Sequence, residues 1–219
     1  MADPTTVEAE AESIPDRAQE GSRRAERMNR TRSALRLAGL ELFAREGFEN
    51  VTVEEIAEKA GVSRRTFFRY FPSKEDVLYL GHDRFFSEFS TLLLGLPASL
   101  SDIEAVCTTF AALSPHTARG RDALELGRRA VNSSTLLRGR ESDHVRDDLV
   151  LLGRAIADRR GLAEPDEACR LLAALSLTTY RLALDKWLHG PVPGDLAQEI
   201  VDEFALMARV AGAGGAAPA

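Results

Sequence analysis

The stretch from Thr52 to Lys74, TVEEIAEKAGVSRRTFFRYFPSK, constrains the fold of this chain more than any other part of the sequence. Thr52 is a good N-cap residue, and Glu55 three positions later can bond back to it, so the pair predicts a capping box. Apolar residues then recur at helical spacing, at Val53, Ile56, Ala57 and Ala60. Gly61 is expected to end this helix, because glycine adopts a positive φ at little cost. The pattern predicts a short helix with one apolar face and two defined ends.

A second short helix is expected directly afterwards, starting at Arg64 with Ser63 as its cap. Phe67 and Phe71 are four residues apart and so share the buried face, and Pro72 stops the helix. The opposite side carries Arg64, Arg65, Phe68 and Arg69. Two short helices joined by a tight glycine turn, the second with exposed arginines, follow the helix-turn-helix plan. An ordinary helical hairpin with solvated arginines would have the same local pattern.

The full string of residues around this turn resembles the TetR (tetracycline-repressor-like) family of transcriptional regulators. The residues that match the family pattern are Thr52, Val53, Ile56, Ala57, Ala60, Gly61, Val62, Ser63, Thr66, Tyr70, Phe71, Lys74 and Glu75. The resemblance covers about residues 30–80. It implies an all-α fold, with an N-terminal three-helix helix-turn-helix DNA-binding domain and a C-terminal helical ligand-binding and dimerisation domain.

We divide the chain into four segments on this basis. Residues 1–22 are expected to be a disordered acidic tail, because they mix Ala, Glu, Pro, Thr and Ser without periodicity. Residues 23–75 are the expected DNA-binding domain, residues 76–211 the helical regulatory and dimerisation domain, and residues 212–219 a second disordered tail. Beyond about residue 80 the expectation of helices depends on periodicity alone, and no strand pattern is present.

The second helix of the motif is expected to enter the major groove of DNA. Arg64 and Arg65 lie in its first turn, from which a bidentate contact to guanine is geometrically feasible. The resemblance implies that Thr66 touches a base or a thymine methyl group. Phe68 stands where the family commonly has tyrosine, so a phenolic hydrogen bond to phosphate is lost. Phe68 either contacts a thymine methyl or packs inward, and Arg69 can replace the lost anchor.

Other residues of the motif are expected to reach phosphates, which position the protein without reading sequence. By resemblance, Tyr70 and Lys74 would hold phosphates, and Thr52 would do so through its hydroxyl or a nearby backbone amide. The expected DNA-binding residues are therefore Thr52, Ser63, Arg64, Arg65, Thr66, Phe68, Arg69, Tyr70 and Lys74.

The charge distribution agrees with this assignment, although the formal net charge of −6 is unusual for a DNA-binding protein. Residues 23–80 carry twelve basic against nine acidic side chains, whereas residues 1–22 carry one against six and residues 81–219 fifteen against nineteen. The positive segment contains the motif, as attraction to phosphate requires. Five arginines precede the motif, at Arg23, Arg24, Arg27, Arg30 and Arg32. They are either a solvated helix start or an arm along the DNA backbone or in the minor groove.

Apolar periodicity predicts further helices on both sides of the motif. A first helix from about Arg30 to Glu46 would support it, and a fourth from Lys74 to about Gly95 would, by resemblance, be the lever between the domains. A break is expected at Ser114-Pro115. The other expected helices cover about residues 101–113, 119–131, 141–160, 165–189 and 195–211, with residues 132–140 ambiguous.

The last two helices carry apolar faces that are broader than one copy needs for its own core. Because one helix-turn-helix reads only a half-site, we expect a homodimer on a palindromic operator in double-stranded DNA. The resemblance also implies a repressor that an unidentified small-molecule effector releases from the operator. Candidate residues lining an effector cavity are Phe85, Phe89, Phe110, Tyr180 and Trp187, although each such residue is more commonly plain core. Threonines that could orient a ligand are Thr108, Thr109, Thr178 and Thr179, although helix-interior threonine ordinarily bonds to its own backbone.

An enzyme is not expected, because the four histidines are scattered and no HExxH, CxxC, GxSxG or P-loop motif occurs. We therefore assign no catalytic residue, no metal ligand and no cofactor. Cys107 and Cys169 lie in helical apolar patterns as small buried residues, with a redox switch, or a metal sensor using His116 or Cys107, as alternatives. Without a membrane-spanning run or a membrane partner, a cytoplasmic location is expected. The competing function is a helical protein–protein interaction module without sequence-specific DNA binding.

Overall fold

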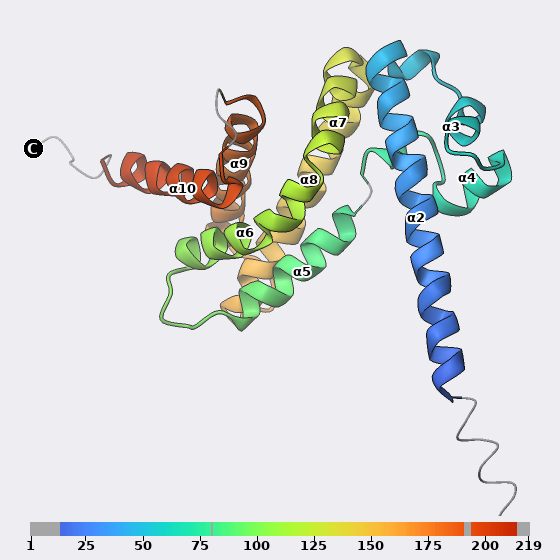
Figure 1. Ribbon diagram of the computed structural model, residues 1–219. Helices are drawn as coiled ribbons and strands as arrows, with labels where there is room; N and C mark the ends of the chain where they lie inside the picture. The colour runs from blue at the N-terminus through green and yellow to red at the C-terminus, as the bar shows by residue number, and fades with distance from the viewer. Residues whose placement is uncertain (1–13, 80, 191–193, 214–219) are drawn as a thin grey trace, which may run out of the picture. The chain divides into compact units, whose positions relative to one another are not determined.

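The computed structural model describes residues 14–79, 81–190 and 194–213, and within these residues the regular elements are all helices (Figure 1). The chain divides into two compact units, residues 1–80 and 81–219. The N-terminal unit contains α2 (Ile14–Glu46), the 3-10 helix η1 (Phe48–Asn50), α3 (Val53–Lys59), α4 (Arg64–Tyr70) and the 3-10 helix η2 (Glu75–Val77). The C-terminal unit contains α5 (His82–Gly95), α6 (Asp102–Arg119), α7 (Arg121–Ser133), α8 (Thr135–Arg159), α9 (Glu167–His189) and α10 (Leu196–Ala213). The all-α prediction is confirmed.

The N-terminal unit packs α2, α3 and α4 around one apolar core. Side chains that are at most 1% exposed there are Leu35, Leu40, Phe43, Phe48, Val51, Ile56, Phe67 and Val77. Gly39 lets α2 pass close to η2, since a Cβ atom at this position would lie 3.0 Å from Val77 Cγ2. A larger residue at position 39 would push these two elements apart.

The helix-turn-helix has the boundaries that its sequence predicts. Thr52 is the N-cap of α3, and Gly61 has a φ of 68° in the turn that follows the helix. Ser63 is the N-cap of α4, and Phe71 is its C-cap. These capping and glycine predictions are confirmed, because each depends on residues within one or two turns of the helix end.

The first helix starts much earlier than expected. α2 begins at Ile14 rather than near Arg30, so residues 14–22 are helical although we expected a disordered tail up to residue 22. Pro15 lies in the first turn, where its missing N–H has no helical partner to lose. The segment that follows is rich in Ala, Arg, Glu and Gln, which are strong helix formers, and it extends the helix without apolar periodicity. The expected disorder of residues 1–13 and 214–219 lies outside the described residues.

The expected fourth helix is interrupted. Only η2 follows Lys74, and α5 begins at His82 after Gly81, whose φ is 93°. A left-handed residue cannot continue a right-handed helix, and glycine adopts this conformation without a Cβ clash. His82 Nε2 is hydrogen-bonded to Asp148 Oδ1, which ties the start of α5 to α8. The prediction of one helix from Lys74 to Gly95 was therefore wrong.

The C-terminal unit is a helical bundle in which α10 packs on α9 and α6, and α8 packs on α9 and α5. Its core includes Phe89, Leu93, Val106, Phe110, Leu152, Ile156, Ala173 and Ile200, each at most 1% exposed. Pro115 lies inside α6, which runs unbroken to Arg119, so the expected break at Ser114-Pro115 was wrong. The buried residues of α6, such as Phe110 and Leu113, all precede the proline, which is itself exposed in the last turns of the helix. Packing of this buried part offsets the backbone hydrogen bond that Pro115 cannot donate. The ambiguous stretch 132–140 is split between the end of α7 and the first residues of α8.

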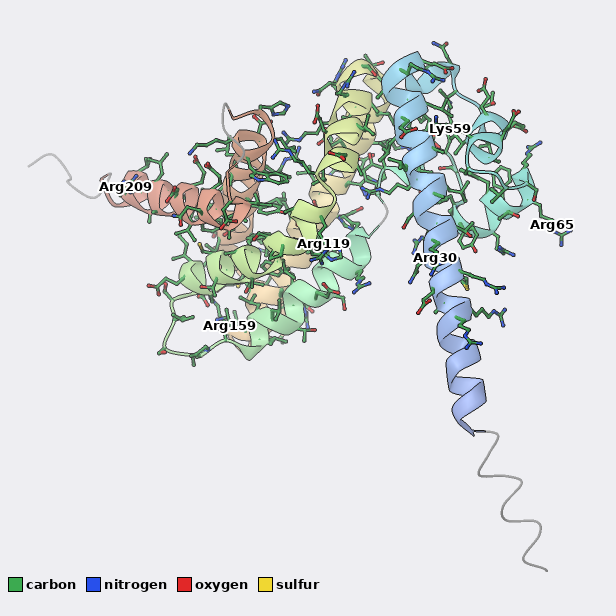
Figure 2. All side chains as sticks on the ribbon, in the orientation of Figure 1. Arg30, Lys59, Arg65, Arg119, Arg159 and Arg209 are labelled. Carbon is green, nitrogen blue, oxygen red and sulfur yellow. The ribbon has the colours of Figure 1, made fainter. Side chains whose placement is uncertain are left out.

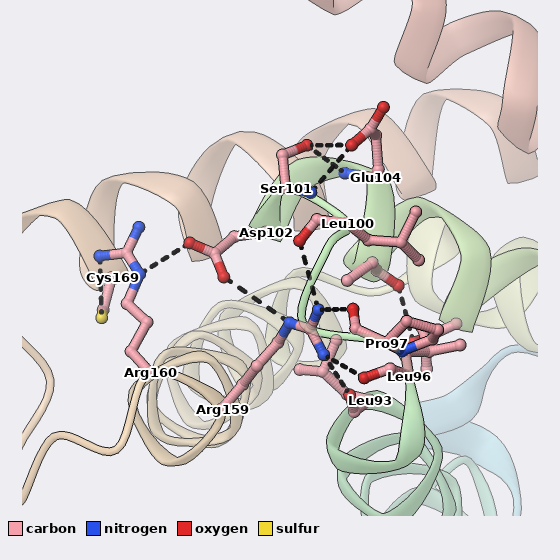
Figure 3. Close-up of polar contacts among 12 residues, drawn as sticks. Leu93, Leu96, Pro97, Leu100, Ser101, Asp102, Glu104, Arg159, Arg160 and Cys169 are labelled. Carbon is pink, nitrogen blue, oxygen red and sulfur yellow. Dashed lines mark hydrogen bonds and ion pairs between the residues drawn. The ribbon is translucent and has the colours of Figure 1, made fainter.

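Arg159 holds the loop between α5 and α6 in place through hydrogen bonds and an ion pair (Figure 3). Its side chain is 9% exposed and lies 3.7 Å from Asp102. The guanidinium donates hydrogen bonds of 2.7–3.3 Å to the carbonyl oxygens of Leu93, Leu96, Pro97 and Leu100. The buried cation thus gathers carbonyl groups from the end of α5 and from the loop that leads to α6. None of the helices in the described ranges is long and apolar enough to cross a membrane.

Candidate DNA-binding surface

The polar surface of the N-terminal unit starts at the first turn of α3. The backbone N–H and the hydroxyl of Thr52 both donate to Glu55 Oε2 at 2.7 Å, and the N–H of Glu55 donates back to Thr52 Oγ1 at 3.3 Å. The backbone bond first, and then the hydroxyl bond, hold the pKa of Glu55 below its ordinary value. The cap therefore presents Thr52 as an exposed side chain in a fixed rotamer.

Ser63 and Thr66 form the corresponding start of α4. The N–H of Thr66 donates to Ser63 Oγ at 3.2 Å, and the two hydroxyl oxygens lie 3.0 Å apart. Phe67 below them is fully buried, with its ring centroid 5.6 Å from that of Phe71. This buried pair holds α4 on the core and leaves its outer face to polar residues.

The two arginines of the first turn differ in their surroundings. Arg64 forms an ion pair of 3.0 Å with Glu54 of α3, and its guanidinium lies 5.5 Å from the centroid of the Phe68 ring. Arg65 points away from the domain at the outer end of α4 (Figure 2), and among the described residues its guanidinium has no hydrogen-bond or ion-pair partner. Sequence reasoning missed Glu54, although an acidic residue in the first turn of the preceding helix was visible. Arg65 is therefore the arginine that is immediately available to a base edge.

Phe68 is exposed rather than packed inward, with 45% of its surface accessible. Its ring meets that of Phe67 edge to face at 5.5 Å and supports Arg64 from the other side. At the end of α4, Arg69 donates a hydrogen bond of 3.1 Å to the hydroxyl of Tyr70 and lies over that ring. An exposed apolar ring with one guanidinium over it, and a second guanidinium over Tyr70 at the end of the helix, suit a groove that presents thymine methyl groups and phosphates.

The ammonium group of Lys74 forms hydrogen bonds inside the N-terminal unit. It donates to the carbonyl oxygens of Phe48 at 2.7 Å and Val51 at 2.8 Å, and it lies 4.2 Å from the centroid of the Phe48 ring. These bonds tie the segment before η2 to the end of η1. These bonds give Lys74 a structural role within the domain, and its contact with phosphate stays a prediction.

The five expected ligand residues do not surround a described cavity. Phe85, Phe89, Phe110 and Tyr180 contact one another in one aromatic cluster, in which the Phe110 and Tyr180 centroids are 4.3 Å apart and nearly parallel. Burial raises the pKa of the Tyr180 hydroxyl. Trp187 lies apart from this cluster, donating to the Gly194 carbonyl at 3.0 Å. Their role as lining residues stays a prediction, which the packing of the four rings does not support.

Two hollows of about 440 Å³ each are described in the C-terminal unit, and none of those five residues lines them. The first lies between α7, α8 and α9 and has an apolar floor that includes Val145, Leu149 and Leu177. Arg128 and Arg181 border it, paired with Asp185 and Glu141 respectively. The second lies between α5 and α8 and is lined by Phe86, Ser87, Ser90, Thr91, Leu94, Leu151, Arg154, Ala155 and Asp158.

The threonines and cysteines of this unit mostly serve local packing. Thr108, Thr109 and Thr179 donate to the carbonyl four residues earlier, at 2.7–2.8 Å, as helix-interior threonine ordinarily does. Thr178 instead lines the first hollow. Cys107 and Cys169 are free thiols whose pKa values are raised, mainly by burial, which lowers their reactivity. No group of three His, Cys, Asp or Glu side chains suited to a metal ion occurs in the part of the chain that the structure describes.

Comparisons with known proteins agree with the geometry of this surface. Residues 35–79 match the family described as bacterial regulatory proteins, tetR family. The HTH-type transcriptional regulator TcmR of Streptomyces glaucescens is 39% identical over 90 residues, which cover 41% of this chain and 40% of TcmR. The transcriptional regulator MftR of Mycobacterium tuberculosis is 37% identical over 84 residues, which cover 38% of this chain and 39% of MftR. The chain thus matches about two fifths of the length of these curated relatives.

The similarity to solved structures extends over both units. The crystal structure of Thermus thermophilus FadR, a TetR-family transcriptional repressor in complex with lauroyl-CoA, is 27% identical with a TM-score of 0.54. That comparison covers 81% of this chain and 93% of FadR. All of these relatives are transcriptional regulators, not enzymes.

Proposed function

This chain belongs to the TetR family of bacterial transcriptional regulators, and on that premise we propose that it is a dimeric repressor. In this proposal α4 occupies the major groove of each half of a palindromic operator, and a small-molecule effector bound in the C-terminal unit releases the DNA. The observation that carries the proposal is the outer face of α4, which carries Arg64, Arg65, Arg69 and an exposed Phe68 on a helix held by buried Phe67.

We assign the contacts as follows. Arg65 and Thr66 read base edges near the start of α4, and Arg64 joins them when DNA displaces Glu54 from its guanidinium. Phe68 contacts a thymine methyl group, while Arg69 and Tyr70 hold phosphate at the other end of the helix. Thr52 and Ser63 contribute through their hydroxyls or the adjacent backbone amides.

The proposed dimer interface is the outer face of α9. Leu171, Leu175 and Leu182 are 61%, 43% and 56% exposed and lie on the side of α9 opposite its buried residues. Such an apolar stripe costs free energy in water unless a partner covers it. A second copy is the partner that a two-fold operator requires, since one helix-turn-helix reads one half-site.

The proposed effector site is the hollow between α7, α8 and α9. Its apolar floor and the two arginines at its border suit a molecule with an apolar part and an anionic group, which would compete with Asp185 and Glu141 for Arg128 and Arg181. The structure of FadR, which aligns with 81% of this chain, is a complex with lauroyl-CoA. Thr178 and Leu182 belong both to this hollow and to the outer face of α9, so effector binding would alter the dimer interface.

The test of DNA binding is a titration of a duplex selected by the protein from a random pool, at several salt concentrations. Arg65→Ala is expected to weaken binding to this duplex about 5- to 150-fold, corresponding to roughly 1–3 kcal/mol, and to relax specificity at one base pair. Arg146→Ala, which removes an exposed arginine of α8, is the matched control and should bind like wild type. Equal affinities of the two variants would contradict the docking of α4, and a helical protein–protein module would show weak binding without sequence preference.

The dimer and the effector need separate measurements. Leu175→Glu together with Leu182→Glu should give a monomer in sedimentation experiments and abolish cooperative operator binding, because charges cannot be buried unpaired at the interface. Lauroyl-CoA is the first probe of the hollow, with free coenzyme A as the control. Release of the operator by lauroyl-CoA that is lost in Arg128→Leu would support the site, and release that persists in this variant would place the effector elsewhere.

A further inference from the structure

We propose that residues 23–32 of α2 are a second DNA-binding element, which lies along the phosphate backbone beside the base pairs that α4 reads. We call residues 23–32 the α2 extension. The inference rests on the proposed function, because it assumes that α4 docks on DNA. It adds an interaction surface that the helix-turn-helix does not contain.

The α2 extension projects from the core of its own unit. All residues from Arg23 to Arg30 are exposed, and from Arg23 onward the first buried side chain of α2 is that of Leu35. Figure 1 shows α2 running past α3 and α4 and continuing beyond them, and Arg30 lies on this protruding part in Figure 2. At 1.5 Å per residue the ten residues span about 14 Å. Residues 23–30 therefore contribute no buried side chain to the core, and their side chains are accessible to a partner.

The side chains of the α2 extension are mainly cationic and therefore suit a polyanion as that partner. It contains five arginines and one glutamate, and Met28 is its only bulky apolar residue. Arg23, Arg27 and Arg30 follow the i, i+4, i+7 spacing and share one face of the helix. Glu26 lies 3.7 Å from Arg30, but both side chains are more than 60% exposed, so this pair is weak. Without an apolar stripe the extension has no face that would pack on another protein helix.

A contact within the N-terminal unit joins the α2 extension to the recognition helix. The guanidinium of Arg32 lies 5.9 Å from the centroid of the Phe71 ring, and Phe71 is the C-cap of α4. The root of the extension thus lies against the end of α4 that carries Arg69 and Tyr70. DNA held by α4 would have its backbone next to this end, and the extension continues the positive surface from there.

The expected consequence is a salt-dependent gain in affinity without a gain in specificity. Each phosphate neutralised by a cation adds about 0.9 to the slope of log affinity against log salt. Three arginine–phosphate contacts would therefore account for a loss of roughly 40-fold between 50 and 200 mM salt. Because phosphate contacts carry no sequence information, the ratio of operator to random-DNA affinity should not depend on them.

The test compares two triple variants of the full chain. In the first, Arg23, Arg27 and Arg30 are replaced by glutamine, which keeps a high helix propensity. In the control, the exposed arginines Arg84, Arg129 and Arg146 of the C-terminal unit are replaced in the same way, so both proteins lose the same charge. Helical content by circular dichroism verifies that both variants are folded. The salt slope, the specificity ratio and the footprint on the selected duplex are then measured.

We expect the first variant to lose about three units of the slope of log affinity against log salt. It should also protect a shorter stretch of the DNA backbone in the footprint, with its ratio of operator to random-DNA affinity unchanged. A first variant that behaves like the control would overturn it while leaving the proposed function intact. Tighter binding by the first variant would also overturn it, because the arginines would then be held by the acidic residues 1–22. If wild type itself failed to bind any selected duplex, both the inference and the proposed function would be wrong.

Discussion

The outer face of α4 and the aromatic cluster of the C-terminal unit were both expected to bind a partner, but only the first exposes its side chains to solvent. On α4, Phe67 is buried while Arg65 and Phe68 are exposed. In the C-terminal unit, Phe110 and Tyr180 are both buried and stacked on each other. A seven-residue helix on a small domain packs against other elements along one face only, so the apolar periodicity of its sequence is enough to separate buried from exposed residues. A helix inside a bundle packs against other helices along several faces. Periodicity then cannot predict whether the space beside an aromatic ring is filled by a neighbouring side chain or left open for a ligand.

The largest expected effect tests whether the aromatic cluster is core. Phe110 is 1% exposed, and its ring centroid lies 4.7 Å from that of Phe89. Phe110→Ala should lower the free energy of unfolding by about 3–5 kcal/mol, because it leaves a cavity in a packed core. During urea unfolding, fluorescence of Trp187, the chain's single tryptophan, reports the C-terminal unit, and circular dichroism reports the helices of both units. Phe68→Ala is the matched control and should change stability by less than about 0.5 kcal/mol. A well-tolerated Phe110→Ala would mean that the cluster is loosely packed and open to a ligand.

A smaller loss of stability is expected for a substitution of Lys74, which tests whether this residue of the N-terminal unit belongs to the core or to the DNA-binding surface. Lys74→Met removes two hydrogen bonds to buried carbonyl groups, so it should destabilise the N-terminal unit by about 1–3 kcal/mol. Circular dichroism should detect the loss, while the salt slope of DNA binding stays as in wild type. Lys59→Met, which breaks only a partly exposed ion pair with Glu41, is the control. A stable Lys74→Met protein with a reduced salt slope would restore Lys74 as a phosphate ligand.

A substitution of Gly81 tests whether this glycine causes the interruption between η2 and α5. Gly81→Ala should cost about 1–2 kcal/mol, because its φ of 93° is unfavourable for a residue with a Cβ atom even though no atom lies within 4 Å of that position. Gly139→Ala within α8 has equal space and no positive φ, so it should be neutral or stabilising. Thermal unfolding of the two variants compares them directly. If Gly81→Ala were as stable as Gly139→Ala, the chain around residue 81 would have to be able to adopt a continuous helix.

The smallest expected effect concerns the cap of α3 and depends on pH. Thr52→Ala should lower stability by about 1 kcal/mol at neutral pH, because the first turn loses its side-chain acceptor. The lowered pKa of Glu55 in the folded state means that its contribution is present above the unfolded pKa and is lost as pH falls through the folded value. The difference between wild type and variant should therefore shrink below about pH 4. Urea unfolding at pH 7 and pH 3 measures this, and a difference that grows in acid would contradict the capping role.

Several features of this protein were determined by the sequence itself. The capping box at Thr52, the glycine turn at Gly61 and the buried pair Phe67 and Phe71 could all be predicted, because each depends on side chains within four residues of one another. The all-α class followed from the same local periodicity. The exposed arginines of α4 followed too, since the opposite face was already assigned to the core.

Only the tertiary structure decided the roles of residues whose partners are distant in the chain. Lys74 bonds to carbonyl groups more than twenty positions away, and Arg159 to carbonyl groups about sixty positions away, which no local pattern encodes. Pro115 stays within a helix because α6 is buried against α10, and Gly81 interrupts one where periodicity alone expected continuity. The physical reason is the same in each case. Short-range rules set the conformation of a turn of helix, whereas desolvation and packing against remote elements determine whether a given ring, cation or proline is core, anchor or surface.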